Sequence, residues 1–459
     1  MARKYFGTDG IRGLVGEFPI VPDFALKLGW AAGKVLAASG NASVVIGKDT
    51  RLSGYVLESA LQSGLCAAGV DVRLVGPMPT PAIAHLTRAF HASAGVVISA
   101  SHNPYYDNGV KFFQSSGHKI SSELERKIEQ LMHTDLSGYV AEYHDLGKAL
   151  KLGDARGRYI EHVKYSFPPN LKLDGIKLVV DCANGAAYDI APKVFHELGA
   201  EVIACEISPT GFNINEKCGV MDSQLLTQKV LEHKADLGIA LDGDADRVVV
   251  VDENGQVIDG DQIIASLAQY LLENNLLRNN LVTTTIMSNM GLELYLKTIG
   301  IDLIRTSVGD KYVVEKMGEL GCNLGGEQSG HIIIGSNQAT GDGIKAALGV
   351  LAMYRQAQNP ISKVLNKFVP VPQFTRNIRY DHKYYHKFTT LRGEKIEEIS
   401  KFYQERYAKS VRVVIRQSGT EPIIRLMVES QNADLAQNLL TEMQNKIENE
   451  IQSLLENSK

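Results

Sequence analysis

A pattern of strand, helix, glycine and strand occurs three times along the chain, over residues 43–75, 177–204 and 281–304. In each copy, an apolar run and a helical period are followed by Gly69, Gly199 or Gly300, and the next apolar run begins shortly afterwards. A glycine in this place suits the left-handed residue that ends many helices. Because a strand, a crossover helix and a second strand usually share one sheet, the pattern predicts three similar mixed α/β domains.

The C-terminal part follows a different pattern. Pro370 and Pro372 favour an extended segment, and the residues after them predict a helix over 395–407, a strand hairpin over 411–428 and a long amphipathic helix over 433–455. This order indicates an α+β domain behind a hinge-capable linker. A chain of 459 residues has about three times the usual domain length. We therefore predict four domains, over residues 1–155, 156–255, 256–368 and 369–459.

The composition is that of a soluble globular enzyme. A net charge of −4 with mixed signs and no long basic run argues against nucleic-acid or membrane partners. The first residues lack the apolar region of a signal peptide, and no run of about 18 apolar residues occurs, so a cytoplasmic location is expected. The five cysteines have no metal-ligand spacing and are expected to be reduced thiols.

A serine loop follows one of the apolar runs. Residues 99–104, with the sequence Ser-Ala-Ser-His-Asn-Pro, come directly after the run Gly95–Ile98. A hydroxyl in this place stands at the carboxyl end of a strand, where open α/β sheets bind their ligands. The same residue types also form ordinary turns, so this loop alone leaves both readings open.

Asp242, Asp244 and Asp246 alternate along a short segment between two apolar runs. Carboxylates crowded in this way repel one another, and a bound cation explains the crowding. Oxygen-only ligands favour a hard ion, Mg²⁺ before Ca²⁺. A calcium-binding helix–loop–helix would also place Glu253 at position twelve. That alternative fails because Arg247 stands where the loop needs glycine and because both flanks read as strands.

Two further loops carry polar side chains. Residues 325–331, Gly-Gly-Glu-Gln-Ser-Gly-His, suit the hydroxyl groups of a sugar, although a glycine-rich hairpin turn fits them equally well. Residues 416–422, Arg-Gln-Ser-Gly-Thr-Glu-Pro, together with Arg425, offer hydroxyls, backbone N–H groups and guanidinium groups to a phosphate. A plain hairpin with surface arginines is the alternative there.

Together, these four loops resemble the active site of the α-D-phosphohexomutase family, whose members move a phosphoryl group between two positions of one hexose. The resemblance extends to residues 7–13, 47–51 and 306–310, and thus covers essentially the whole chain in order. Residues 3–10 and 104–113, Ser99 and Gln328 are most similar to the bacterial members that act on glucosamine phosphates.

The resemblance implies four domains around a central cleft, with one loop from each of the first three and the phosphate-binding loop of the fourth brought over it. It implies that Ser101 carries the phosphoryl group and that one Mg²⁺ is held by Ser101, Asp242, Asp244 and Asp246. Lys111 and His331 are the implied acid and base, with Arg12 and Arg247 stabilising charge. Sugar recognition is implied for Glu327 and Ser329, and binding of the distal phosphate for Arg416, Ser418, Gly419, Thr420 and Arg425.

The expected reaction interconverts glucosamine 6-phosphate and glucosamine 1-phosphate through a phosphoserine and a 1,6-bisphosphate, supplying amino-sugar precursors of the cell wall. Glucosamine or glucose 1,6-bisphosphate is the expected activator, and a homodimer is the expected assembly. Mannose and glucose phosphates are the alternative substrates. A non-catalytic sugar-phosphate sensor and an aspartate-based phosphatase are more distant alternatives, and a serine hydrolase using His102 is disfavoured because adjacent residues of an extended segment point to opposite faces.

Overall fold

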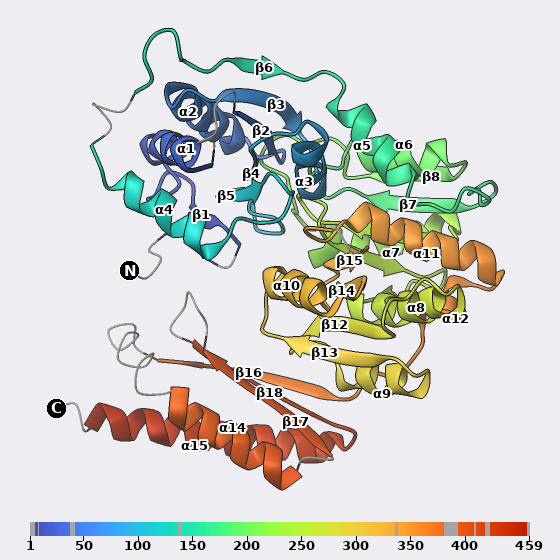
Figure 1. Ribbon diagram of the computed structural model, residues 1–459. Helices are drawn as coiled ribbons and strands as arrows, with labels where there is room; N and C mark the ends of the chain where they lie inside the picture. The colour runs from blue at the N-terminus through green and yellow to red at the C-terminus, as the bar shows by residue number, and fades with distance from the viewer. Residues whose placement is uncertain are drawn as a thin grey trace. The chain divides into compact units, whose positions relative to one another are not determined.

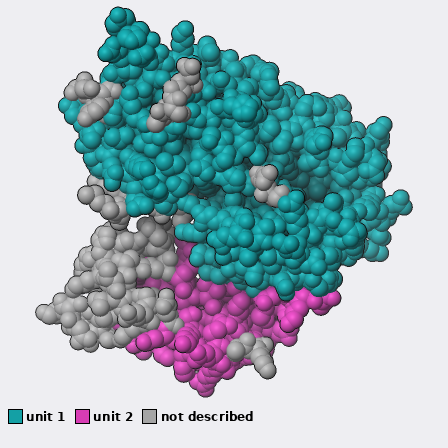
Figure 2. Space-filling model, in the orientation of Figure 1, with its two compact units in different colours: residues 1–287, 299–367 teal, residues 288–298, 368–459 magenta. Residues whose placement is uncertain are grey.

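The structure is a computed structural model that describes residues 5–7, 9–36, 42–135, 140–335, 338–380, 393–407, 410–417 and 423–456 (Figure 1). The chain divides into two compact units. The first comprises residues 1–287 and 299–367, and the second comprises residues 288–298 and 368–459 (Figure 2). The first unit contains three β-sheets and the second contains one. All five cysteines are free thiols, as predicted.

The first sheet is built from the N-terminal third of the chain. Its elements are β1 (Ile11–Leu14), α1 (Pro22–Leu36), β2 (Ser43–Lys48), α2 (Ser53–Ala67), β3 (Asp71–Pro77), α3 (Thr80–Ala89), β4 (Ala94–Ile98), β5 (Asp107–Gln114), α4 (Ser122–Met132) and β6 (Ala149–Lys151). The strand order is β1-β5-β4-β2-β3-β6. Strand β2 runs parallel to β3 and β4, whereas β5 is antiparallel to both β4 and β1.

The second sheet has the order β11-β10-β9-β7-β8. The elements of this region are α5 (Ala155–Lys164), β7 (Lys177–Asp181), α6 (Ile190–Glu197), β8 (Glu201–Cys205), the 3₁₀ turn η1 (Gly219–Met221), α7 (Gln224–His233), β9 (Leu237–Leu241), β10 (Val248–Val251) and β11 (Val257–Ile258). Strands β7, β8 and β9 are parallel, and β10 is antiparallel to β9.

The third sheet has the order β13-β12-β14-β15. Its region contains α8 (Gly260–Glu273), β12 (Leu281–Thr285), β13 (Asp302–Thr306), α10 (Asp310–Leu320), β14 (Leu324–Gly326), β15 (Ile332–Ile334), α11 (Gly343–Ala357) and α12 (Ile361–Leu365). Strand β12 is parallel to β13 and β14, and β15 is antiparallel to β14. Helix α9 (Met290–Thr298) follows β12 along the chain and belongs to the second unit.

The predicted repeat is confirmed in all three regions. Strands β2 and β3, β7 and β8, and β12 and β13 are parallel pairs, each joined through one helix. Gly69, Gly199 and Gly300 have φ angles of 88°, 105° and 75°, which is the left-handed conformation that the sequence predicted.

A feature that the repeat did not reveal is the place of two further strands in each region. The strand orders β5-β4-β2-β3, β10-β9-β7-β8 and β15-β14-β12-β13 are equivalent, and the strand at the start of each is antiparallel to its neighbour. The serine, acidic and glycine-rich loops therefore join β4 to β5, β9 to β10 and β14 to β15. All three predicted functional loops occupy the same topological position.

The second unit contains an antiparallel sheet with the order β16-β18-β17. Its elements are β16 (Gln373–Arg379), α14 (Gly393–Tyr407), β17 (Val411–Gln417), β18 (Ile423–Ser430) and α15 (Ala433–Glu456), together with α9. Buried Val413, Leu426 and Val428 of the sheet share one apolar core with Leu440 and Met443 of α15. The predicted hairpin and both predicted helices are thus confirmed. Within the described ranges, every helix is too short or too polar to span a lipid bilayer.

Helices α1 and α2 approach each other closely enough to require glycine. A Cβ atom added to Gly64 would lie 2.0 Å from the carbonyl oxygen of Leu26. We expect Gly64→Ala to lower the free energy of unfolding by about 1–3 kcal/mol, because the helices must move apart. Gly157→Ala on α5 is the matched control, since a Cβ there meets no atom within 4 Å, and this change should stabilise by ~0.5–1 kcal/mol. Thermal unfolding measures both, and equal midpoints would contradict the close contact.

Candidate active site

Ser101 lies just beyond the carboxyl end of β4 and faces the acidic loop. Its side chain is buried, and its Oγ donates a hydrogen bond of 2.6 Å to Oδ2 of Asp242. Its backbone N–H donates to Oγ of Ser99 at 2.9 Å, and its φ of 52° is left-handed. The serine loop of the first sheet and the acidic loop of the second are therefore in direct contact.

Asp242, Asp244 and Asp246 form a cluster in the loop that joins β9 to β10. One carboxylate oxygen from each lies within 4.8 Å of the others, and all three residues are buried. Burial raises the pKa of Asp242 well above its ordinary value, and the neighbouring carboxylates add to this effect. Oδ2 of Asp244 accepts a hydrogen bond of 2.6 Å from Thr80 at the start of α3, so the cluster is also tied to the first sheet's region.

The cluster fits a magnesium ion. Within the described part of the chain, Oδ1 of Asp244 and Oδ1 of Asp246 are buried and have no hydrogen-bond partner. Buried carboxylate oxygens left without a partner are costly, and oxygen-only donor sets are those that Mg²⁺ prefers. This group of carboxylates agrees with the predicted metal ligands.

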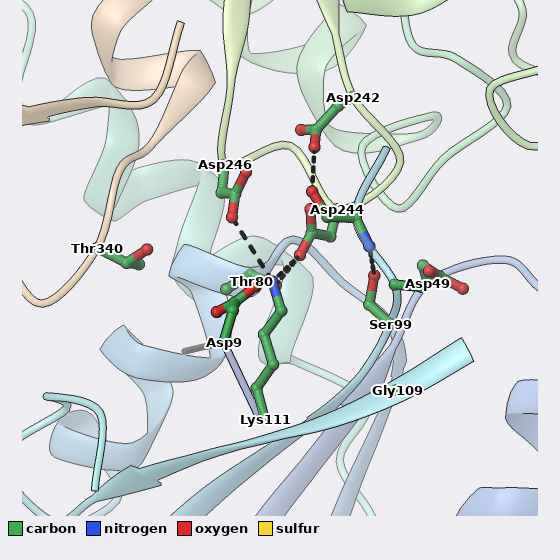
Figure 3. A network of polar contacts seen from close by, with 12 residues as sticks. Asp9, Asp49, Thr80, Ser99, Gly109, Lys111, Asp242, Asp244, Asp246 and Thr340 are labelled. Carbon is green, nitrogen blue, oxygen red and sulfur yellow. Dashed lines mark hydrogen bonds and ion pairs between the residues drawn. The ribbon is translucent and has the colours of Figure 1, made fainter. Parts of the chain in front are cut away.

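Lys111 on β5 points into the same cluster (Figure 3). Its Nζ lies 2.9 Å from Oδ2 of Asp244, 3.7 Å from Oδ2 of Asp246 and 3.2 Å from Oδ2 of Asp9. Burial alone would lower the pKa of Lys111, but the three carboxylates outweigh burial and raise the pKa above its usual range. Lys111 is therefore held as a cation beside the Ser101 loop.

His331, in the loop between β14 and β15, completes the contact with the third sheet. Its Nδ1 lies 3.6 Å from Oδ1 of Asp246, and the backbone N–H of Gly341 donates to its Nε2 at 2.7 Å. That N–H places the ring proton on Nδ1, facing Asp246. Burial opposes protonation of the ring, but Asp246 and Asp310 raise the pKa of His331 to about 9. A doubly protonated ring would have to release the Gly341 contact, so the geometry favours the Nδ1–H form.

Sequence reasoning missed several site residues as individual residues, among them Asp9, Lys119 and Asp310. Nζ of Lys119 lies 2.7 Å from Oδ2 of Asp310 and also contacts Oδ1 of Asp9. Since Asp9 also contacts Lys111, and Asp310 lies 3.4 Å from Nε2 of His331, these side chains form a ring of alternating acidic and basic groups. Asp9 and Asp310 lie inside motifs that pointed to the family, but nothing in the sequence around Lys119 indicated its partners.

The remaining predicted residues of the first unit surround this ring. Arg12 forms an ion pair with Asp9, and its Nη1 lies 3.4 Å from the carbonyl oxygen of Ala100. The backbone N–H of Arg247 donates to Oδ1 of Asp242 at 3.2 Å. Glu327 accepts a hydrogen bond of 3.3 Å from the backbone N–H of Gly309, and burial raises the pKa of Glu327. Ser329 is exposed at the tip of the same loop.

Arg416 and Arg425 belong to the second unit, where they are register partners on β17 and β18. Ser418, Gly419 and Thr420 of the predicted phosphate-binding loop lie outside the described residues.

One prediction about the serine loop was wrong. His102 does not point away from Ser101: Nδ1 of His102 lies 3.4 Å from Oγ of Ser101. The left-handed φ of Ser101 breaks the extended geometry on which the prediction depended. Burial and the cationic Arg247 and Arg12 lower the pKa of His102 to about 4.

The fold and the site define an α/β enzyme of phosphoryl transfer, in which a serine meets a carboxylate cluster that fits a metal ion. The chain matches four domain families in order: phosphoglucomutase/phosphomannomutase α/β/α domain I over residues 3–138, domain II over 157–255, domain III over 259–371 and the C-terminal domain over 387–446. The chain belongs to this phosphohexomutase family and is an isomerase that acts as an intramolecular phosphotransferase.

Known relatives agree with this assignment. The phosphoglucosamine mutase of Mannheimia succiniciproducens is 53% identical over 434 residues, which cover 95% of this chain and 96% of that protein. The phosphoglucosamine mutase of Aeromonas hydrophila is 52% identical over 449 residues, covering 98% and 99%. Among solved structures, a phosphoglucomutase/phosphomannomutase family protein from Burkholderia thailandensis has a TM-score of 0.78 at 24% identity, covering 97% of each chain. Aspergillus fumigatus N-acetylphosphoglucosamine mutase, solved with GlcNAc-6P and magnesium, has a TM-score of 0.68 at 17% identity, covering 97% and 96%, and shares the fold.

The acidic cluster generates a prediction about metal binding. Mg²⁺ should raise the midpoint of thermal unfolding, because an ion that binds only the folded chain stabilises it. Asp244→Asn should weaken Mg²⁺ binding by about tenfold or more, since it removes one negative charge that faces the ion. Asp222→Asn is the matched control: among the described residues, the Asp222 carboxylate accepts a hydrogen bond only from the nearby backbone N–H of Gln224. Titration of the unfolding midpoint with Mg²⁺ compares the variants, and equal Mg²⁺ responses in both would exclude this loop as the metal site.

Proposed function

We propose that the enzyme interconverts glucosamine 6-phosphate and glucosamine 1-phosphate through a phosphorylated Ser101 and a 1,6-bisphosphate. The observation that carries this proposal is the contact between Oγ of Ser101 and the acidic cluster, with the cationic Lys111 beside both. The choice of an amino sugar is supported by the relatives named phosphoglucosamine mutase at 52–53% identity over nearly the full chain.

A phosphorylated residue is needed because the C1 and C6 oxygens of a pyranose cannot share one phosphorus atom in line. In the first half-reaction, the bond between phosphorus and Oγ of Ser101 breaks as a bond to the free sugar hydroxyl forms. The hydroxyl proton leaves the sugar, and Oγ gains a proton. The bisphosphate then turns over, and its other phosphoryl group returns to Ser101 by the reverse bond changes.

Charge neutralisation and positioning dominate this chemistry. We assign the metal site to Ser101, Asp242, Asp244 and Asp246; when bound, Mg²⁺ supplies neutralisation of the charge on the transferring phosphoryl group. Lys111 contributes a fixed positive charge next to Ser101, supported by its three carboxylate neighbours. Arg12 and Arg247 add positive charge at the edges of the same loops.

Lys111 and His331 are the proposed acid and base. Both are buried, and each lies within 3.6 Å of a carboxylate oxygen of the acidic loop. We assign recognition of the sugar hydroxyls to Glu327 and Ser329 of the glycine-rich loop. The distal phosphate is assigned to Arg416 and Arg425, with Ser418, Gly419 and Thr420 between them in sequence.

The enzyme needs a first phosphoryl group, and we propose that glucosamine or glucose 1,6-bisphosphate supplies it to Ser101. The homodimer, the cytoplasmic location and the four domain boundaries stay predictions. Analytical ultracentrifugation of the purified chain tests the dimer directly.

Loss of the carrier hydroxyl should abolish turnover. Ser101→Ala should reduce the mutase rate to below a few per cent and leave the unfolding midpoint nearly unchanged, because one hydroxyl in a loop adds little to the core. Intact mass after incubation with glucose 1,6-bisphosphate should show one added phosphoryl group on the wild type and none on the variant. Ser116→Ala, an exposed serine after β5, is the matched control. A Ser101→Ala enzyme that keeps its rate would rule out the carrier, and phosphate found on Asp242 would indicate the phosphatase mechanism.

Substrate preference separates the proposed function from the alternatives that act on glucose or mannose phosphates. A 2-amino group differs from a hydroxyl in charge and in hydrogen-bond capacity, so polar groups near C2 should discriminate between the sugars. We expect kcat/KM to be highest for glucosamine 6-phosphate and much lower for glucose and mannose phosphates. Measuring all three on one phosphorylated, Mg²⁺-loaded preparation decides this point. A preference for mannose or glucose would assign the chain to the other branch of the family, and no turnover at all would favour a sensor.

A further inference from the structure

Arg51 lies fully buried next to the serine loop and does not contact the acidic cluster. It follows β2 by three residues, and its side chain has an exposed fraction of 0%. Its Nε donates to Oδ2 of Asp49 at 2.8 Å, and its backbone N–H donates to Oδ1 of the same carboxylate at 3.0 Å. This pairing fixes the guanidinium plane and leaves four N–H groups for other partners.

Those four N–H groups all meet carbonyl oxygens of the serine loop. Nη2 donates to the oxygens of Ser101 and Asn103 at 2.9 and 2.8 Å, and Nη1 donates to the oxygen of Asp107 at 3.1 Å and to that of Pro104. Every N–H group of this guanidinium is therefore used. Arg51 has no donor left for a sugar or a phosphate, and its whole hydrogen-bonding capacity serves the backbone around Ser101.

A second residue, from the loop between β8 and α7, donates to two of the same oxygens. Nδ2 of Asn215 lies 2.9 Å from the carbonyl oxygen of Ser101 and 3.1 Å from that of Asn103. These two oxygens thus each accept one hydrogen bond from Arg51 and one from Asn215. Because Asn215 belongs to the region of the second sheet, it ties the serine loop to the part of the chain that carries the acidic cluster.

The conformation of Ser101 explains why such support is needed. Its left-handed φ of 52° is unfavourable for a residue with a Cβ atom and persists only when surrounding contacts enforce it. The backbone of the acidic loop also packs tightly here, since a Cβ atom added to Gly243 would lie 2.6 Å from the oxygen of Ser101. A small rotation of this peptide would move Oγ away from Asp242, and displacements of about 1 Å can slow phosphoryl transfer by about a hundredfold.

We propose that Arg51 and Asn215 are positioning residues for phosphoryl transfer, which hold the Ser101 backbone in the conformation that directs Oγ at the acidic loop. This inference rests on the proposed role of Ser101 as the phosphoryl carrier. Accordingly, these two side chains should affect the rate of phosphoryl transfer and not the binding of the sugar.

Asn215→Asp is the sharpest test. Asn215 itself has a left-handed φ of 58°, and aspartate tolerates that conformation and has nearly the same shape, so the change replaces the two donated hydrogen bonds with a negative charge that faces the same carbonyl oxygens. Asn213→Asp is the matched control: its Nδ2 donates only to the oxygen of Ser208 within the same loop. Arg51→Lys is the second variant, because it keeps the positive charge beside Asp49 but cannot reach four carbonyl oxygens at once.

Four quantities are measured on the full chain loaded with Mg²⁺. The first is the rate at which glucose 1,6-bisphosphate phosphorylates Ser101, which is measured by intact mass in a single turnover. The others are kcat and KM for glucosamine 6-phosphate and the unfolding midpoint. For Asn215→Asp we expect the phosphorylation rate and kcat to fall together by about tenfold to a hundredfold, with KM unchanged within about twofold. Arg51→Lys should show the same split with a larger loss, and Asn213→Asp should match the wild type.

The outcomes distinguish the positioning role of Asn215 from the carrier role of Ser101. If the wild type is turned over and phosphorylated but Asn215→Asp behaves like Asn213→Asp, the positioning role is wrong and the carrier stands. If kcat, KM and the unfolding midpoint of Asn215→Asp all deteriorate in parallel, its role is merely structural and the inference is also overturned. If the wild type itself takes no phosphoryl group on Ser101, the proposed function fails, and the inference fails with it.

Discussion

The crowding of three carboxylates in one buried loop is the constraint on which the rest of the site depends. Asp242, Asp244 and Asp246 would repel one another in a low-dielectric interior, so cations and hydrogen-bond donors must surround them. Lys111, His331, Thr80 and the hydroxyl of Ser101 fill this role from two other regions of the chain. The same attraction that neutralises the cluster therefore brings the loops of three sheets together.

The repeated topology makes this convergence possible. Each of the three sheets has the same four-strand order, and in each the functional loop joins the third strand of the parallel set to an antiparallel neighbour. The loops can differ in chemistry because the strands on either side are apolar and buried. Serine, carboxylate and glycine-rich loops thus occupy one place in three copies of one scaffold, and the ring of ion pairs through Lys119 and Asp310 joins the first copy to the third.

The sequence predicted the parts whose signal is local. Periodicity and glycine position identified the strand–helix–strand units, and the motifs identified Ser101 and the acidic cluster, because crowded carboxylates need a chemical reason wherever they occur. It could not predict pairs formed across the chain: Lys119 and Asp310 are 191 positions apart, and Asn215 and Ser101 are 114 apart. The orientation of His102 was wrong for a related reason. Ser101 has a left-handed φ, and the donors to its carbonyl oxygen, Arg51 and Asn215, are distant in sequence, so an isolated turn sequence gives no sign of this geometry.

Two buried cations in the region of the first sheet, Lys111 and Arg51, have different hydrogen-bond and ion-pair partners. Lys111 faces three carboxylates across distances of 2.9–3.7 Å, so its single compact charge is shared among three acidic groups. The rigid guanidinium of Arg51 donates to one carboxylate and four neutral carbonyl oxygens, so none of its N–H groups is left for another partner. A lysine at position 51 could not reach four acceptors at once, because its ammonium is compact and has only three donors. The different surroundings of the two cations, three carboxylates for Lys111 and mainly neutral carbonyl oxygens for Arg51, therefore suit the geometry of the two side chains.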